Sequence, residues 1–325
     1  MNEFQLIERF FARPPRSASV RLGIGDDAAL LAPAPGCEVA VSVDMLVAGR
    51  HFFADVDPEA LGHKTLAVNL SDLAAMGATP RWALLAGALP DADEGWLAAF
   101  ARGFLELADA HAVDLVGGDT TRGPLNLCVT IIGEVPAGQA LRRDGARAGD
   151  DLYVSGSLGD AALAVAARDG RVELTPGTLA ACRARLDRPQ PRTMLGTQLR
   201  TLASSAIDLS DGLTGDLDHI LARSGVGAEV ELARLPTSSA LTALLQGAAR
   251  SVGLACLLAG GDDYELCFTA PVANREAVGR AARAADTPVT RVGSITATAG
   301  LVVRDERGAH LAALPGGFDH FGGGR

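Results

Sequence analysis

The sequence predicts an α/β protein, in the broad sense that includes α+β arrangements, with two domains. The chain has 325 residues, which is more than one hydrophobic core usually supports. Both halves mix strand-like with helix-like patterns and place Gly-Asp turns at strand ends. A break lies between them, where Pro136-Ala137-Gly138 precedes a basic stretch at 142–147. We therefore expect domains at 1–137 and 150–325, joined by a connector at 138–149.

In the first half, residues 38–44 alternate between apolar and polar side chains, which predicts a strand because strand side chains alternate with a period of two. This strand places Ser42 and Asp44 on its polar face. Residues 58–78 predict a helix that begins at a proline and ends near a glycine. The other elements expected here are a helix with an apolar stripe at Leu97, Phe100, Phe104 and Leu107, a short strand at 114–116 and a strand at 125–135.

The second half repeats the theme of a strand, a Gly/Asp turn and a helix. We expect strands at 152–155, 206–209, 254–259 and 265–269, with helices at 160–167 and from Leu213 onward.

Lys64 is the single lysine among 29 lysine and arginine residues, and this excludes two common kinds of phosphate-handling site. A P-loop needs Gly-Lys-Ser/Thr after a strand, and a protein-kinase site needs a strand lysine with a His-Arg-Asp loop. Any phosphate bound here would therefore be neutralised by metal ions on aspartates, by backbone N–H groups and by a few arginines. The net charge of −10 argues against a nucleic-acid partner.

Composition also indicates the compartment. The apolar fraction of 48% and the mean hydropathy of +0.20 leave no room for extensive disorder. The five cysteines are odd in number and lack CxxC spacing, as expected of reduced thiols in the cytosol. The N-terminal residues do not resemble a signal peptide, and no apolar run approaches the ~18 residues of a membrane span. We expect a cytoplasmic protein without a membrane partner.

Several aspartates indicate metal binding. Asp150 and Asp216 follow glycine in turns, where aspartate usually caps a helix or bonds to its own backbone. Asp44, Asp72 and Asp208 instead lie among apolar residues, where an unpaired carboxylate is costly. Magnesium suits such positions because it takes carboxylate oxygens together with water and substrate phosphates. The histidines contain no HExxH pattern, so zinc is not expected.

Six segments carry further motifs in a characteristic order, at 23–31, 44–52, 69–78, 117–123, 206–212 and 260–266. Taken together they resemble the thiamine-monophosphate kinase family, which is part of the aminoimidazole-ribonucleotide-synthetase-like superfamily. The resemblance extends over nearly the whole chain, from Phe4 to the tail at 318–321. One such motif alone would be weak, but six in order are specific.

The resemblance implies ATP-dependent phosphorylation of thiamine monophosphate to thiamine diphosphate, the last step of thiamine diphosphate biosynthesis. It implies an N-terminal domain that binds ATP and several Mg²⁺ ions and dimerises through its sheet, and a C-terminal α/β domain. Transfer would be direct and in line, because the acceptor phosphate supplies its own nucleophile. The apolar strand faces at 39–43 and 125–135 need cover, which agrees with a homodimer.

The resemblance also assigns site residues. The metal ligands would be Asp27, Ser42, Val43, Asp44, Asp72, Asp119, Asp208 and Asp211, of which Asp44, Asp119 and Asp208 would be catalytic. The residues that contact ATP would be Gly118, Asp119, Arg143 and Ser210. The residues that contact thiamine monophosphate would be His51, Asp262 and Phe318.

Two positions depart from the family pattern. Threonine commonly precedes the aspartate at 44, whereas Val43 offers only its backbone carbonyl. Glutamate is common at 262, where this chain has the shorter Asp262, so Asp262 could cap the turn while Asp263 or Glu265 is the functional acid. Three of the assigned residues have an alternative role without a ligand. Arg143 could be a solvated surface arginine, His51 a partly buried histidine whose hydrogen bonds are satisfied within the protein, and Phe318 a core residue that anchors the tail.

Related enzymes on the same scaffold are the rival interpretation. A selenophosphate synthetase needs a reactive Cys or Sec near the N-terminus, whereas the first cysteine here is Cys37. A hydrogenase-maturation carbamoyl dehydratase needs a C-terminal cysteine. Aminoimidazole-ribonucleotide synthetase shares the fold but lacks the sequence motifs found here at 69–72 and 208–211. A non-catalytic nucleotide- or cation-binding regulator is the alternative from another class, and the complete carboxylate set argues against it.

Overall fold

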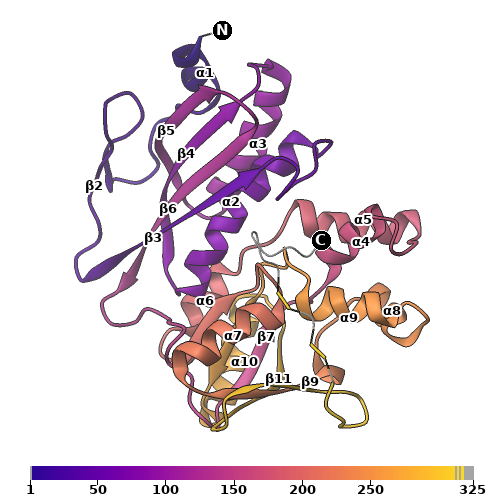
Figure 1. Ribbon diagram of the computed structural model, residues 1–325. Helices are drawn as coiled ribbons and strands as arrows, with labels where there is room; N and C mark the ends of the chain where they lie inside the picture. Colours follow the sequence, from indigo (N-terminus) through magenta and orange to yellow (C-terminus); the bar gives the residue numbers. More distant parts are fainter. Residues whose placement is uncertain (1, 312, 315, 318–325) are drawn as a thin grey trace. The chain divides into compact units, whose positions relative to one another are not determined.

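The computed structural model describes residues 2–311, 313–314 and 316–317 (Figure 1). Its internal contacts divide the chain into two compact units. Unit 1 comprises Met1–Leu73 and Ala78–Ala140, and unit 2 comprises Ala74–Gly77 and Leu141–Arg325. The main boundary between the units thus lies between Ala140 and Leu141. The assignment of residues 74–77 to unit 2 was not expected from the sequence.

Unit 1 is built on a four-stranded sheet in which β6 is antiparallel to both of its neighbours and β4 is parallel to β5 (Figure 1). Across the sheet the strands are β3 (Cys37–Val47), β6 (Asn126–Pro136), β4 (Thr79–Leu89) and β5 (Asp114–Arg122). The edge strands are therefore β3 and β5.

Two of these strands differ from the sequence-based expectation. Strand β4 was missed, because it is a central strand whose residues are largely apolar and show no alternation. Strand β5 was expected to end at residue 116, but it continues to Arg122 through the Gly-Gly-Asp motif. Turn-forming residues alone therefore did not reveal where this strand ends.

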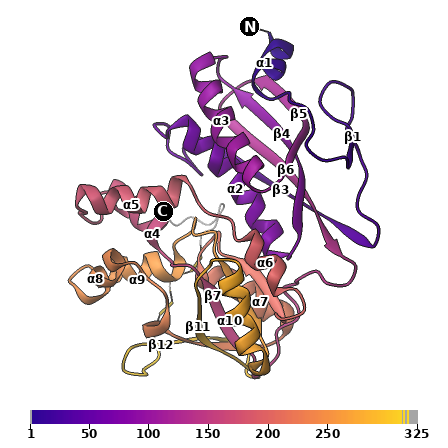
Figure 2. The same cartoon turned by 180° about the vertical axis from the view of Figure 1, so that it is seen from behind.

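Helices α2 (Pro58–Ala75) and α3 (Glu94–Ala110) lie along one face of this sheet (Figure 2). The two helices approach so closely that only glycine fits at two contact points. A Cβ atom at Gly62 would lie 2.0 Å from the Phe100 carbonyl oxygen, and one at Gly103 would lie 1.9 Å from the Glu59 carbonyl oxygen. Helix α2 ends at Ala75 rather than near residue 78, since Gly77 adopts a positive φ of 64°.

The segment before β3 contains helix α1 (Glu3–Phe10) and a short antiparallel pair, β1 (Val20–Leu22) with β2 (Leu30–Leu31). We call residues 16–34, which include this pair, the strap. Val20 of the strap packs with Trp82 and Val116 of the sheet. The strap therefore covers part of one sheet face.

Unit 2 contains a six-stranded sheet in which all neighbours are antiparallel except β12 and β9. Its strands, in spatial order, are β12 (Gly300–Arg304), β9 (Gly227–Glu231), β11 (Val289–Thr296), β7 (Asp151–Ser155), β10 (Leu266–Ala270) and β8 (Ser205–Asp208). Its helices are α4 (Asp160–Arg168), α5 (Pro176–Asp187), α6 (Thr193–Leu199), α7 (Leu213–Ser224), α8 (Ser239–Gln246), α9 (Arg250–Ala259) and α10 (Arg275–Ala284).

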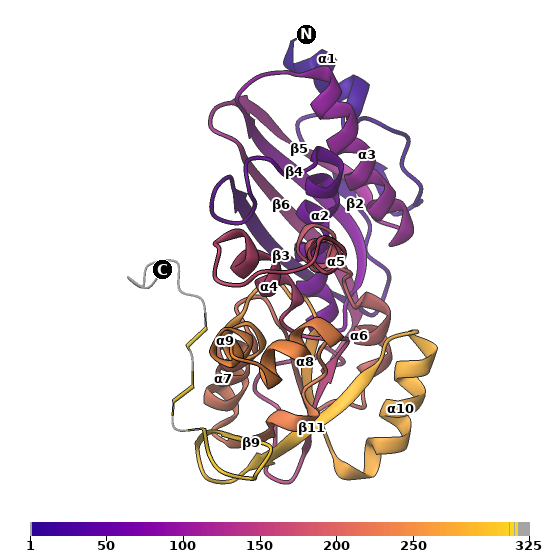
Figure 3. The same ribbon diagram turned by 90° about the vertical axis from the view of Figure 1, so that its right-hand side faces the viewer.

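Helices α6 and α10 lie on one side of the unit 2 sheet and α7 and α9 on the other (Figure 3). The core on the α6/α10 side includes the stacked rings of Tyr153 and Phe268, whose centroids are 5.1 Å apart. The strand expected at 254–259 is wrong, because these residues form the second half of α9. A short apolar run does not distinguish a buried strand from a buried helix.

No helix within the described residues is long and apolar enough to cross a membrane.

Candidate functional site

Strand β3 and helix α2 bring several of the predicted site residues together. The Ser42 hydroxyl donates a hydrogen bond to Asp72 Oδ2, and the backbone N–H of Asp44 donates to Asn69 Oδ1 at 3.1 Å. Asn69 and Asp72 reach the strand together because residues three apart share one side of a helix. We call Ser42, Asp44 and Asp72 the β3–α2 group. It presents a hydroxyl and two carboxylates, which are hard oxygen donors of the kind that Mg²⁺ prefers.

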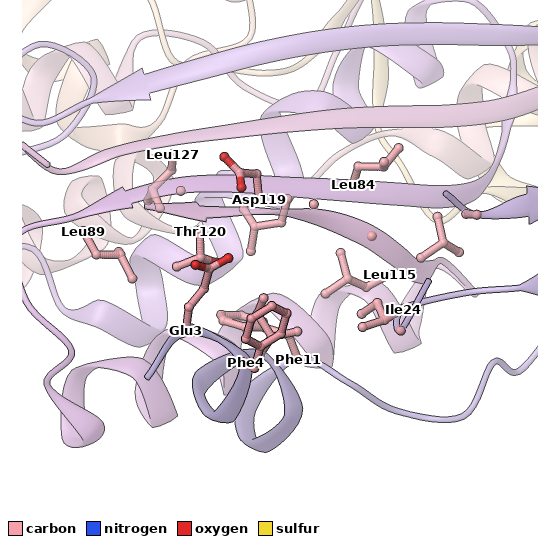
Figure 4. Close-up of a pocket in the computed structure, with 18 of the residues that line it drawn as sticks. Glu3, Phe4, Phe11, Ile24, Leu84, Leu89, Leu115, Asp119, Thr120 and Leu127 are labelled. Carbon is pink, nitrogen blue, oxygen red and sulfur yellow. The ribbon is translucent and has the colours of Figure 1, made fainter. Parts of the chain in front are cut away.

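A cavity of about 540 Å³ lies at the other edge of unit 1, between α1, α3, the strap and β5 (Figure 4). One part of its lining is aromatic, with Phe4 from α1 and Phe11 directly after that helix. The other part is polar, with Asp27 from the strap and Gly118 and Asp119 from β5. A cavity with an apolar wall and a few acidic groups suits a ligand that has both a flat apolar part and a metal-bound anionic part.

Gly118 is required by the backbone of the sheet. Its φ is +152°, and a Cβ atom here would lie 1.8 Å from the carbonyl oxygen of Leu85 on β4. Any other residue would push β5 away from β4. The glycine therefore lets Asp119 follow within the same continuous strand.

The sheet separates the predicted metal ligands of unit 1 into two sets. Asp44 pairs with Val129, whereas Asp119 is in register with Ala86 and Cys128, and Cys128 pairs with Met45. Directly paired residues point to the same face and successive residues to opposite faces. Asp119 therefore shares the face of Met45, and Asp44 lies on the other face.

This separation agrees with a second observation. Among the described residues, no three His, Cys, Asp or Glu side chains are grouped so that they could hold a metal ion. The β3–α2 group and the Asp27/Asp119 set each contribute two carboxylates. One or two carboxylates suffice for Mg²⁺ only when phosphate and water complete its shell. The residues present thus fit a metal that arrives with a phosphorylated ligand.

His51 follows β3 in a tight turn. Its Nδ1 accepts a hydrogen bond from the backbone N–H of Val47 at 3.0 Å, which orients the ring. With Nδ1 as the acceptor, the proton of the neutral imidazole is on Nε2. Nε2 is then the donor atom of the ring.

In unit 2, the two predicted site motifs are hydrogen-bonded to each other beyond the ends of β8 and β10. The N–H of Asp262 donates to the Ser210 carbonyl at 2.9 Å, and the N–H of Tyr264 donates to the Leu209 carbonyl at 2.8 Å. Gly261 permits this approach, since a Cβ atom there would lie 2.5 Å from the Ser210 carbonyl oxygen. Asp262 itself has a positive φ of 68°. Such strain outside glycine concentrates at functional sites.

Asp208 and Asp211 flank the start of α7 together with Asp216. Asp216 is buried and accepts the backbone N–H of Asp211 at 3.0 Å, as expected of an aspartate that follows glycine at a helix start. Burial, and then the charges of Asp208 and Asp211, raise the pKa of Asp216 to about 7. At this raised pKa Asp216 keeps its proton more readily than an ordinary aspartate, which reduces its repulsion with the charges of Asp208 and Asp211.

The three acids at 262, 263 and 265 have different surroundings. Asp263 is buried and accepts the Gly159 N–H, with oxygen distances of 2.9 and 3.0 Å. Glu265 is fully buried and bonds to Arg185, Arg192 and Ser155. Asp262 is partly exposed. The two alternatives to Asp262 as a ligand-binding acid are thus engaged in the interior.

The remaining predicted positions are less constrained by the structure. Arg143 is exposed, and its carbonyl accepts the hydroxyl of Ser224 at 2.9 Å. Val43 is 58% exposed on the face opposite Asp44. Phe318 lies outside the described residues. Asp150 accepts the Arg147 N–H at 3.0 Å, in the structural role expected for it.

The cavity wall contains residues that the motif analysis missed. Phe4, Trp96 and Phe100 belong to no motif, and at helical spacing they look like ordinary core residues. Phe4 is nevertheless 79% exposed. A large aromatic residue in the first turn of a short N-terminal helix was the signal that could have identified it.

Comparisons with known proteins agree over both units. Residues 25–135 match the model of the AIR synthase related protein N-terminal domain, and residues 147–306 match that of the C-terminal domain. Thiamine-monophosphate kinase of Escherichia coli strain K12 is 47% identical over 323 residues, which cover 98% of each chain.

Solved structures give the same result. The crystal structure of thiamine-monophosphate kinase from Stenotrophomonas maltophilia K279a is 50% identical, with a TM-score of 0.86, and covers 93% of this chain and 96% of that one. A structure described as AaThiL complexed with AMPPCP and TMP is 30% identical with a TM-score of 0.77, and 89% of each chain is covered. These matches confirm the fold class and the family resemblance that the sequence predicts.

Proposed function

The chain belongs to the thiamine-monophosphate kinase family, and on that premise we propose that it transfers the γ-phosphoryl group of ATP to thiamine monophosphate. The products are thiamine diphosphate and ADP. The observation that carries the proposal is the 47% identity to a thiamine-monophosphate kinase over 98% of both chains. A relative at 30% identity with AMPPCP and TMP bound supports the same pair of substrates.

The cavity beside β5 is the proposed place of the nucleotide base. Its aromatic wall suits a purine, and its acidic part lies next to Gly118 and Asp119, which the family resemblance assigns to ATP. A polyphosphate cannot lie among aspartates unless cations reverse the local field. Mg²⁺ would supply that positive charge and withdraw electron density from the phosphoryl group.

The two carboxylate sets of unit 1 support a homodimer. Asp27 and Asp119 line the cavity, whereas Ser42, Asp44 and Asp72 lie across the sheet. We propose that a cavity set from one copy meets the β3–α2 group of a second copy, so that each site takes ligands from both. Val39, Val41, Val43 and Met45 support an interface of this kind, because all four are exposed on one face of edge strand β3.

Unit 2 supplies further proposed ligands. Asp208 and Asp211 would offer carboxylate oxygens to magnesium. Ser210 and Arg143 would donate hydrogen bonds to phosphate oxygens, and the forked guanidinium of arginine suits phosphate geometry.

The other proposed contacts complete the metal and thiamine ends of the site. Val43 would contribute only its backbone carbonyl to a metal. His51 and Asp262 would contact thiamine monophosphate, with Phe318 completing that end. The thiazolium ring is cationic, so a carboxylate at 262 favours it over neutral analogues.

The chemistry then requires positioning rather than covalent catalysis. The acceptor is already an ionised phosphate oxygen, so no general base has to generate it. The carboxylates would hold the magnesium ions, whose positive charge would offset that of the two polyanions and so let the two phosphates approach in line. No phosphoenzyme is needed, and none should accumulate when the protein is incubated with labelled ATP in the absence of thiamine monophosphate.

The direct test is conversion by the purified protein. With ATP and Mg²⁺, thiamine monophosphate should disappear and thiamine diphosphate and ADP should form in equal amounts, and chelation of Mg²⁺ should stop both. Light scattering at micromolar concentration should give the mass of two chains. Release of phosphate from ATP without any thiamine diphosphate would show that the substrate is wrong, and a fully active monomer would rule out the shared site.

A further inference from the structure

Asp27 lies at the exposed tip of the strap. Asp26 and Asp27 are both exposed, and the hydrogen bond from the Asp27 N–H to Asp26 Oδ1, at 2.9 Å, is local. The supporting ladder is short, since β1 has three residues and β2 has two. The place of the tip against the cavity is therefore set mainly by what holds the base of the strap.

Asp114 holds one end of that base. It is the first residue of β5 and is 5% exposed. Its Oδ1 accepts the backbone N–H of Arg16 at 2.7 Å, and its Oδ2 accepts that of Ser17 at 3.1 Å. A carboxylate that accepts two backbone N–H groups makes strong, directional bonds. The chain is thereby fixed just before β1 begins.

Glu134 holds the other end. It lies on β6 and is 4% exposed. Its Oε1 accepts the backbone N–H of Ala34 at 2.6 Å, and its Oε2 accepts Nε of Arg81 at 2.8 Å. The chain is thereby fixed just after β2.

Trp82 supports the strap between these two anchors. Its Nε1–H donates to the Ser19 hydroxyl at 3.2 Å, and its ring packs with Val20 and Val116. Trp82 on β4 is in register with Asp114 on β5, and β4 lies between β5 and β6. The strap thus passes over the central strand β4 and is bonded to the strand on either side.

We propose that Asp114 and Glu134 are positioning residues that hold Asp27 against the nucleotide cavity. The inference rests on the proposed function, in which Asp27 binds the magnesium of the nucleotide. Both bonds lie at the base of the strap, so loss of either leaves one end loose and the tip samples more positions. Binding of magnesium nucleotide must then order the tip, and this entropy cost weakens affinity. Once the ligand is bound, Asp27 is in place and turnover proceeds normally.

The test uses Asp114→Asn and Glu134→Gln in the full-length protein, with Asp109→Asn as the matched control. Asp109 forms ion pairs with Arg13 and Arg16 near the same end of the strap, but it is exposed. Calorimetry with Mg²⁺·AMPPCP measures affinity without turnover, and steady-state kinetics give kcat and both KM values.

In both test variants, the Kd for Mg²⁺·AMPPCP and the KM for ATP should rise about threefold to thirtyfold, the equivalent of one weakened charged hydrogen bond. The kcat at saturating Mg²⁺·ATP and the KM for thiamine monophosphate should stay within about twofold. Asp109→Asn should match the wild type, since exposed ion pairs contribute little. Glu134→Gln retains an acceptor for Ala34, so Glu134→Ala should show the larger loss.

Asp27→Asn separates this inference from the proposed function. If Asp27→Asn weakens Mg²⁺·AMPPCP binding and the two anchor variants lower only the melting temperature, Asp114 and Glu134 merely stabilise the fold and the inference is overturned. If Asp27→Asn also leaves the affinity for Mg²⁺·AMPPCP unchanged, both the inference and the proposed metal role of Asp27 are wrong. The proposed formation of thiamine diphosphate is tested separately by product analysis. Should Asp114→Asn not fold, the milder Glu134→Gln decides by the same Kd.

Discussion

Asp44 and Asp119 lie on the two edge strands of one four-stranded sheet, and their side chains leave it on opposite faces. Two strands separate them, which at the usual spacing of strands amounts to about 14 Å. A metal shell spans much less than this, so one Mg²⁺ cannot bind both side chains of the same sheet. If both are catalytic, they act at the same site only when two copies of the chain meet.

Mixing Asp44→Asn with Asp119→Asn protein should therefore restore activity. Each variant alone should lose most of its kcat, because removing a metal-binding carboxylate costs several kcal/mol of transition-state stabilisation. After subunits exchange at random, half of the dimers are mixed, and one of the two sites in each mixed dimer has both aspartates. The recovered rate should approach about a quarter of the wild-type rate.

Glu38→Gln is the control for this experiment, since Glu38 is exposed on the same strand and belongs to no proposed ligand set. Asp44→Asn should lower kcat far more than it lowers the free energy of unfolding, because the bond to Asn69 uses the backbone N–H and is kept. A mixture that has exchanged subunits and stays as inactive as either variant would mean that the two aspartates do not complete one shared site.

Phe4→Ala should weaken nucleotide binding selectively. Phe4 is 79% exposed on the cavity wall, so it contributes little to folding but its ring can stack on a base. Loss of one base–aromatic stack corresponds to a rise of about fivefold to a hundredfold in the KM for ATP. The KM for thiamine monophosphate should not change. Phe10→Ala is the matched control, because Phe10 is on the same helix and is not among the cavity-lining residues.

Titration of nucleotide by fluorescence in the absence of thiamine monophosphate would give the same comparison without turnover. Equal KM values for ATP in Phe4→Ala and Phe10→Ala would place the base elsewhere.

The elements that the sequence predicted well are those in which local pattern and environment agree. Strand β3 is half exposed, so Val39, Val41 and Val43 alternate with polar residues and the period is visible. Strand β4 is central and lacks this alternation, and α9 is a short apolar run that also suits a strand. Both errors have one cause, since burial on all sides removes the polar residues that reveal a period.

The candidate site shows a different limit. The motifs indicated which carboxylates belong to the candidate site. The face of the sheet from which Asp119 projects depends on the pairing of β5 with β4, and β4 was not predicted from the sequence. Asp114 and Glu134 belong to no motif, and their partners are backbone groups about a hundred residues away in sequence, as a separation of 98 residues between Arg16 and Asp114 illustrates. Such contacts have no local signal.

Asp263→Asn should make stability less dependent on pH. Burial raises the pKa of Asp263 well above its usual 3.8, although the Gly159 N–H opposes this. The folded state then binds more protons than the unfolded state between the two pKa values, so this stabilisation is complete below about pH 4 and falls as the pH rises through the folded pKa. The slope is about 1.4 kcal/mol for each pH unit within that interval.

Asparagine keeps an acceptor for Gly159 and cannot ionise. Urea unfolding at pH 5 and pH 8 should therefore show the wild type losing stability relative to Asp263→Asn. Asp169→Asn, at an exposed position, should follow the wild type at both values. Parallel curves for the wild type and Asp263→Asn would mean that Asp263 ionises normally in the folded protein.

Asp262→Ala should raise the KM for thiamine monophosphate and leave the KM for ATP nearly unchanged. Its backbone is held by the Ser210 carbonyl and by the close approach of Gly261, so the partly exposed carboxylate is presented from a fixed turn. It is one methylene shorter than the glutamate common in the family, and a bridging water can span the difference while retaining most of the hydrogen-bond enthalpy. Asp262→Glu should therefore retain binding. Glu265→Gln should instead lower the melting temperature, because Glu265 is buried against Arg185 and Arg192. A rise in the KM for ATP in Asp262→Ala would assign this acid to the nucleotide.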